Sequence, residues 1–155
     1  MNNDDHRKHL ELIQAVITRL AGNSFSIKAW TIALIGTLGA LAAKDADTRL
    51  AIALIFPLLC FWCLDAYYLR HERLYRALYD KVVTSDPQVP VYSLDTRPFN
   101  QEVGGIAKVA LSPTVCYLHV PVLIFALVLV AYSATKPVQG GSNVAPAPTS
   151  ASGKP

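Results

Sequence analysis

The chain has 155 residues, which is the length of a single domain. Hydrophobic residues make up 52% and charged residues 16%, whereas an ordinary soluble domain carries roughly 25% charged residues. This composition excludes a disordered chain and disfavours a typical soluble enzyme, and a net charge of +3 is too small to indicate nucleic-acid binding. We therefore expect a small integral membrane protein.

Residues 1–24 precede the first long apolar run. Within them, five apolar residues recur at helical spacing: Leu10, Ile13, Val16, Ile17 and Leu20. Gly22, Asn23 and Ser24 interrupt this pattern. We expect a cytoplasmic or interfacial amphipathic helix that lies on the membrane surface or against the bundle. The alternative is that these residues simply begin a bent first span.

Two apolar segments then form a predicted transmembrane hairpin, with spans at residues 25–43 and 50–69. About twenty apolar residues in a helix cross a bilayer core. The six residues between the spans, five of them polar, are too few to recross it, so the spans must be antiparallel. The first span is marginal in length and needs Lys28 to extend to the interface. Pro57 predicts a kink in the second span.

Residues 70–113 form the next region, and the helical pattern of the second span continues into it as far as Val83. We expect a cytoplasmic extension of that helix, then a loop, and then a short helix over residues 99–111, which Gly104 and Gly105 weaken. Ser112-Pro113-Thr114 favours the start of a helix, and residues 114–134 form the third span. The tail, residues 135–155, is rich in Pro, Gly, Ser and Ala and is expected to be disordered. The predicted fold is an all-α membrane bundle with three transmembrane helices.

Lys and Arg residues are distributed unevenly around the three spans. The N-terminal flank and the segment between spans two and three together hold ten, whereas the hairpin link and the tail hold four. Positive residues favour the cytoplasmic side of a membrane. This distribution predicts a cytoplasmic N-terminus and a C-terminus on the other side.

The first span carries the most regular pattern in the sequence. Five small residues recur at spacings of four and three, so that they share one stripe of a helix: Ala29, Ala33, Gly36, Ala40 and Ala43. Small residues allow two membrane helices to approach closely. We expect a helix-packing interface here, either within the chain or between copies.

Asp65 is the only acidic residue within a predicted span. Three readings are open: a proton or cation site, an ion pair with Lys28 or Arg70, and an interfacial acid at the start of the cytoplasmic extension. Because the hairpin is antiparallel, Lys28 should emerge at the depth of Asp65. His119, near the start of the third span, could form a hydrogen bond to Asp65. Lys28, Asp65 and His119 are therefore possible polar contacts inside the bundle.

Other chemistry is not indicated by the sequence. Cys60, Cys63 and Cys116 lie in apolar runs, where a thiol usually behaves as a small hydrophobic group. We find no nucleophile–base arrangement, no glycine-rich phosphate loop and no convincing set of metal ligands. We expect no catalytic residues, no metal and no cofactor, and hence no enzyme.

One stretch, FWCLDAYYLRHERLYRALYD at residues 61–80, resembles a family of small bacterial membrane proteins with no assigned activity. Residues 23–25, 42–46 and 111–114 are similar to the same family. The resemblance implies a multi-span protein of the bacterial inner membrane and brings no catalytic residues. It fits a non-enzymatic protein that self-associates or docks a cytoplasmic partner, with residues 67–81 as the docking surface. The alternative is a small channel, a transporter subunit or a membrane-permeabilising effector, such as those found in bacterial defence operons.

Overall fold

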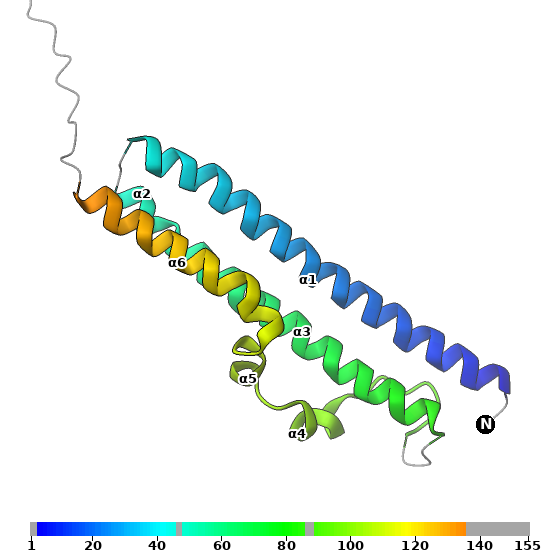
Figure 1. Ribbon diagram of the computed structural model, residues 1–155. Helices are drawn as coiled ribbons and strands as arrows, with labels where there is room; N and C mark the ends of the chain where they lie inside the picture. Colours follow the sequence, from blue (N-terminus) through cyan, green and yellow to red (C-terminus); the bar gives the residue numbers. More distant parts are fainter. Residues whose placement is uncertain (1–2, 46–47, 86–88, 136–155) are drawn as a thin grey trace, which may run out of the picture.

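The structure, a computed structural model, describes residues 3–45, 48–85 and 89–135, and this part of the chain contains helices and no strands. Three helical segments are long and apolar enough to cross a membrane: Asn3–Lys44, Thr48–Val83 and Pro113–Thr135. In Figure 1, α6 (Pro113–Thr135) lies beside α2 (Thr48–Ala53) and the first part of α3 (Ile55–Val83). The N-terminal part of α1 (Asn3–Asp45) extends beyond α6 along the rest of α3. The all-helical class and the three candidate spans agree with the sequence.

Helix α1 (Asn3–Asp45) is continuous over 43 residues and is about 65 Å long at the usual helical rise. The predicted break at residues 22–24 is therefore wrong. A glycine inside a helix costs only about 1 kcal/mol. Packing against α3 outweighs that cost, because Ile17, Ser24 and Ile27 are buried on one face on either side of Gly22.

The second span is divided into α2 (Thr48–Ala53) and α3 (Ile55–Val83), with Leu54 between them. Pro57 has no N–H to donate to the carbonyl of Ala53, so the helical ladder loses one bond at this point. Bonds from the Leu54 amide to the Leu50 carbonyl (3.2 Å) and from the Leu58 amide to the Leu54 carbonyl (3.3 Å) carry the chain past the gap. The distortion predicted from Pro57 is present.

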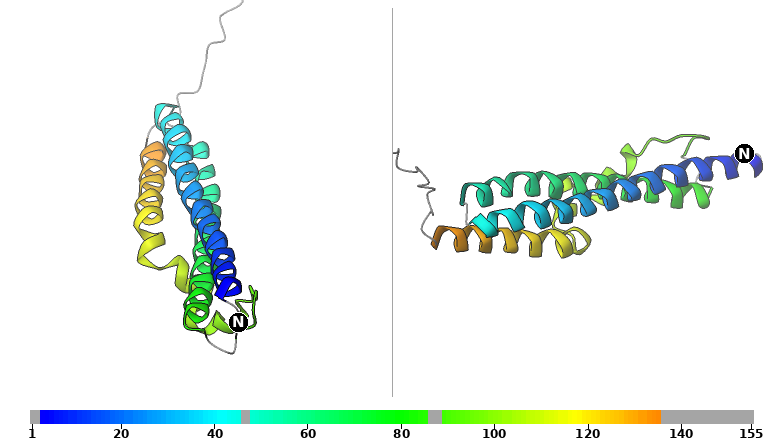
Figure 2. Two further views of the ribbon diagram at one scale, coloured as in Figure 1. Left: turned by 90° about the vertical axis from the view of Figure 1, so that its right-hand side faces the viewer. Right: turned by 90° about the horizontal axis from the view of Figure 1, so that it is seen from above.

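The parts of α1 and α3 that extend beyond α6 form a two-helix stalk, visible in both views of Figure 2. Its core is built from Ile13 and Ile17 of α1 and from Leu74, Leu78 and Val82 of α3. The amphipathic N-terminal segment thus packs on the predicted extension of the second span, which ends at Val83 as expected. The stalk has the kind of apolar core that a water-soluble helix pair would have.

Residues 89–112 return along the stalk towards α6, and we call this segment the strap. It contains η1 (Arg97–Phe99), α4 (Asn100–Val103) and α5 (Ile106–Ala110). The single helix predicted over residues 99–111 is wrong, because Gly104 has a φ of 82° and turns the chain between α4 and α5.

Helix α6 (Pro113–Thr135) begins with a proline in its first turn, as predicted, because that position needs no helical N–H. Its far end packs with α1 and α2 in a cluster of Ala42, Ala51, Leu54 and Leu129. The predicted disordered tail lies outside the described residues, apart from its first position.

Candidate functional site

Four polar side chains from three helices meet inside the bundle: Ser24 and Lys28 from α1, Asp65 from α3 and His119 from α6. The Lys28 ammonium lies 2.6 Å from Asp65 Oδ1 and donates to Ser24 Oγ at 2.7 Å. The Ser24 hydroxyl donates to the same Oδ1 at 2.5 Å. Asp65 and His119 are fully buried, whereas the Lys28 side chain is 25% exposed. We call these four residues the polar cluster.

The helical repeat and the antiparallel hairpin together place these groups. Ser24 and Lys28 are four residues apart, so they share one face of α1, and that face packs against α3. His119 is six residues from the start of α6, about 9 Å along a helix that is about 35 Å long. The polar cluster therefore lies near the stalk end of α6.

His119 is held by its neighbours in a defined orientation. Its Nδ1 lies 3.0 Å from the Val115 carbonyl, and its ring stacks on Trp62 with centroids 5.8 Å apart. Trp62 in turn donates to the Ala110 carbonyl at 3.0 Å, which ties the strap to α3. The distance from His119 Nδ1 to Asp65 Oδ2 is 3.7 Å, which is too long for a hydrogen bond.

A comparison with known protein families, curated proteins and solved structures finds no match. No matching family model therefore supports the resemblance of residues 61–80 to small bacterial membrane proteins. The function must be argued from the geometry of the chain.

The small-residue stripe lies on the outward face of α1. All five of its members, Ala29, Ala33, Gly36, Ala40 and Ala43, are exposed. A Cβ added at Gly36 would meet nothing within 4 Å, whereas one at Gly39 would lie 3.4 Å from Phe125 of α6. The interface within the chain is made by the opposite face, with Ile27, Thr31 and Ala42 buried. The stripe does not pack within the chain, and contact between copies stays a prediction.

The proposed docking segment, residues 67–81, is partly used inside the molecule. Arg70 donates to the Gly104 carbonyl at 2.9 Å and to Asn100 at 2.8 Å, so it holds the strap and does not pair with Asp65. Leu74 and Leu78 are buried in the stalk. Tyr67 remains 45% exposed and is among the groups in this segment that a partner could contact.

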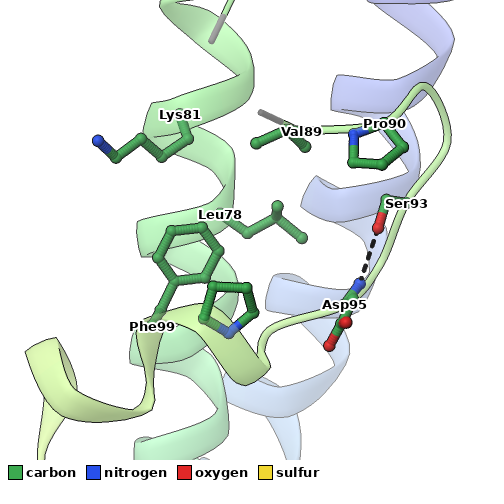
Figure 3. A pocket seen from close by; sticks show the side chains of 8 residues that line it. Leu78, Lys81, Val89, Pro90, Ser93, Asp95 and Phe99 are labelled. Atoms are coloured by element: carbon green, nitrogen blue, oxygen red, sulfur yellow. Dashed lines mark hydrogen bonds between the residues drawn. The ribbon is translucent and has the colours of Figure 1, made fainter. Parts of the chain in front are cut away.

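A cavity of about 280 Å³ lies between α3 and the strap (Figure 3). Leu78 and Phe99 form its apolar centre, and Ser93 and Asp95 lie at one edge. Hydrogen bonds from the Arg97 side chain and backbone lower the pKa of Asp95 to about 2, so this carboxylate stays charged and occupied by Arg97. This edge therefore offers a ligand little beyond the Ser93 hydroxyl.

The described residues contain no group of three or more His, Cys, Asp or Glu side chains placed to hold a metal ion. Cys60 and Cys63 are exposed on α3, in a segment whose surroundings would be lipid if the span is inserted. His9 is buried in the stalk, where its Nε2 bonds to the Ser93 carbonyl at 2.8 Å. We assign none of these groups to the site.

Sequence reasoning missed Ser24 and Trp62 as members of the site. Ser24 was read as part of a helix break, although its spacing of four from Lys28 was a usable signal. The contacts of Trp62 depend on how the strap folds back, which no local pattern in the sequence indicates.

Proposed function

We propose that the chain is a non-enzymatic protein of the bacterial inner membrane that associates with further copies of itself through the outward face of α1. The observation that carries this proposal is the position of the small-residue stripe. It lies on the side of α1 opposite to the side that packs against α3 and α6. Contact with lipid does not require small side chains, whereas close packing of another helix does, so five small residues in register favour a helix partner on that side.

The physics of helix association in lipid favours such a surface. Lipid tails are as apolar as leucine, so spans associate through close van der Waals packing and not through the hydrophobic effect. A Cβ added at Gly36 would face open space, so a neighbouring backbone could approach the helix there. Bulky exposed side chains flank the stripe, with Trp30 on one side and Ile32 on the other.

The polar cluster fits a structural anchor in such a protein. Its one carboxylate is compensated by Lys28, and it brings together side chains of all three long helices at one level. Farther along the bundle, the buried hydroxyls of Thr31 and Ser133 bond to carbonyls of their own helices, at 2.8 and 3.0 Å. The described residues thus offer no chain of polar groups from the cluster to the far end of α6.

Self-association is tested by Gly36→Leu, with Thr37→Leu as the matched control. Both changes add a leucine to an exposed part of α1, but only the first lies on the stripe. Overpacking a close interface costs about 1–3 kcal/mol, or roughly a 5- to 150-fold loss in association. Crosslinking in vesicles and mass measurement in detergent should show the wild-type oligomer retained by Thr37→Leu and lost by Gly36→Leu. A monomeric wild type, or equal assembly of both variants, would remove this proposal.

The proposed orientation places the N-terminus and the stalk in the cytoplasm. It rests on the excess of Lys and Arg in the regions that the fold brings to the stalk end. A reporter that is active only in the periplasm, fused after Pro155, should be active. Activity of a cytoplasm-only reporter at the same position would reverse the orientation.

The alternative, a small channel or permeabilising effector, has the buried charges of Asp65 and Lys28 in its favour. An ion-flux assay in liposomes separates the two functions, because the self-associating protein should conduct nothing. The channel function would be established instead if the wild type conducts ions, Asp65→Asn abolishes the flux and Thr37→Leu leaves it unchanged.

A further inference from the structure

Hydrogen-bond donors and acceptors do not balance in the polar cluster. Oδ1 of Asp65 accepts two hydrogen bonds, one from Ser24 and one from Lys28. Oδ2 of the same carboxylate is buried and accepts none from the described protein groups, and the same holds for Nε2 of His119. A buried polar atom without a partner destabilises the fold, so such atoms in a folded protein normally have one.

The tautomer of His119 follows from its contact with Val115. A carbonyl oxygen only accepts hydrogen bonds, so the Nδ1 that lies 3.0 Å from it must carry the proton. In the neutral ring, Nε2 is then an acceptor. Asp65, ionised beside the Lys28 ammonium, is also an acceptor at Oδ2. Asp65 Oδ2 and His119 Nε2 are both acceptors, so they cannot form a hydrogen bond to each other. A third group that donates one hydrogen bond to each atom would satisfy both.

We propose that Asp65 Oδ2 and His119 Nε2 form a binding site for a small species with two hydrogen-bond donors, either a water molecule or an ammonium ion. Nδ1 of the same ring is 3.7 Å from Oδ2, so Nε2 lies within about two hydrogen-bond lengths of it. One guest molecule could therefore bond to both atoms. The Lys28 side chain is 25% exposed, whereas those of Asp65 and His119 are fully buried, so the site is closest to the surface at Lys28.

Such a guest would link α6 to the α1–α3 pair. Lys28 and Ser24 join α1 to α3 directly, whereas no direct hydrogen bond within the cluster reaches His119 of α6 from Asp65. The bound species supplies that missing connection, next to the stacking of His119 on Trp62. This site does not depend on the proposed self-association.

The first test examines the unmodified protein in lipid bilayers by solid-state NMR with ¹⁵N-labelled histidine. The chain has four histidines, and His119→Gln identifies the signal of His119. We expect a neutral ring with the proton on Nδ1 and a magnetisation-transfer contact between Nε2 and a guest. A contact seen in sodium chloride identifies water, and a signal change specific to ammonium chloride identifies ammonium. A proton on Nε2, or no contact in either salt, overturns the proposal.

The second test uses the sign of a stability change. His119→Phe keeps an aromatic ring on Trp62 and removes Nε2. The change also removes the Nδ1 bond to the Val115 carbonyl, and this loss is the same with or without a guest. If Nε2 has no partner, its removal relieves a cost that offsets this loss, so the Tm stays close to that of the wild type or rises. If a guest bridges it to Asp65, the change removes a hydrogen bond and lowers the Tm by at least about 2 °C. His119→Gln, which keeps a polar group at this position, should lose less than His119→Phe. The site is contradicted if His119→Phe has a Tm equal to or higher than that of the wild type, or if its Tm equals that of His119→Gln.

Discussion

The Lys28–Asp65 pair allows the sharpest test of how the bundle is held together, because its two members are buried to different degrees. Lys28→Met leaves the Asp65 carboxylate fully buried, with the neutral Ser24 hydroxyl as its one remaining donor among the described protein groups. Removing one partner of a buried ion pair costs about 3–5 kcal/mol. Asp65→Asn leaves a Lys28 side chain that is already 25% exposed and can turn to water. Its cost should be smaller, about 1–3 kcal/mol.

The double variant replaces both charges, so its loss of stability should be smaller than the sum of the two single losses. We expect a coupling energy of about 1–3 kcal/mol for residues in direct contact. Unfolding in mixed detergent micelles, followed by circular dichroism, measures all three variants against the wild type. Arg97→Gln is the control, because it breaks the exposed Asp95–Arg97 ion pair of the strap and should leave the unfolding of the spans unchanged. Additive losses, or a Lys28→Met variant as stable as Asp65→Asn, would show that the pair does not stabilise the bundle in this way.

Three further predictions concern the stalk and the strap. Hydrogen bonds from Arg97 lower the pKa of Asp95 to about 2. The stabilisation that these bonds give the strap is therefore present above the ordinary pKa of 3.8 and is lost as the pH falls through about 2. Carboxyl NMR should show the titration midpoint of Asp95 near pH 2 in the wild type and closer to 3.8 in Arg97→Gln. Gly104→Ala places a Cβ at a φ of 82° and 2.9 Å from Lys108 Cδ, so strap amides should exchange faster, by about 1 kcal/mol of local stability. Leu78→Ala should cost about 2–5 kcal/mol in the stalk core, and limited proteolysis should then cut the stalk before the spans.

Much of the fold could be predicted from the sequence, because helical periodicity and apolar length are local properties. The three helices long and apolar enough to cross a membrane, the extension to Val83 and the start of α6 at Pro113 all follow from such patterns. The continuity of α1 could not be predicted, because it depends on packing against α3 across Gly22. The turn at Gly104 was signalled by two adjacent glycines, but whether they would end a helix depends on where the strap must go.

For the site, the sequence identified the charged groups but not their partners. Lys28 and Asp65 stood out as lone charges in apolar runs, and the hairpin gave their relative depth. The two candidate partners of Asp65, Lys28 and Arg70, could be told apart only by the strap, which takes up Arg70. The stripe on α1 was visible from its spacing, but the face of the helix that packs against α3 is set by tertiary contacts.

The unbroken course of α1 has a mechanical consequence. A helix with no hinge between Asn3 and Asp45 behaves as a stiff rod, so a rotation imposed at one end is delivered to the other. Any ligand that twisted the stalk end of α1 against α3 would turn residues 29–43 about the same axis. The small-residue stripe would then face a different direction, and under the proposed self-association the geometry between copies would change although the ligand had not contacted residues 29–43.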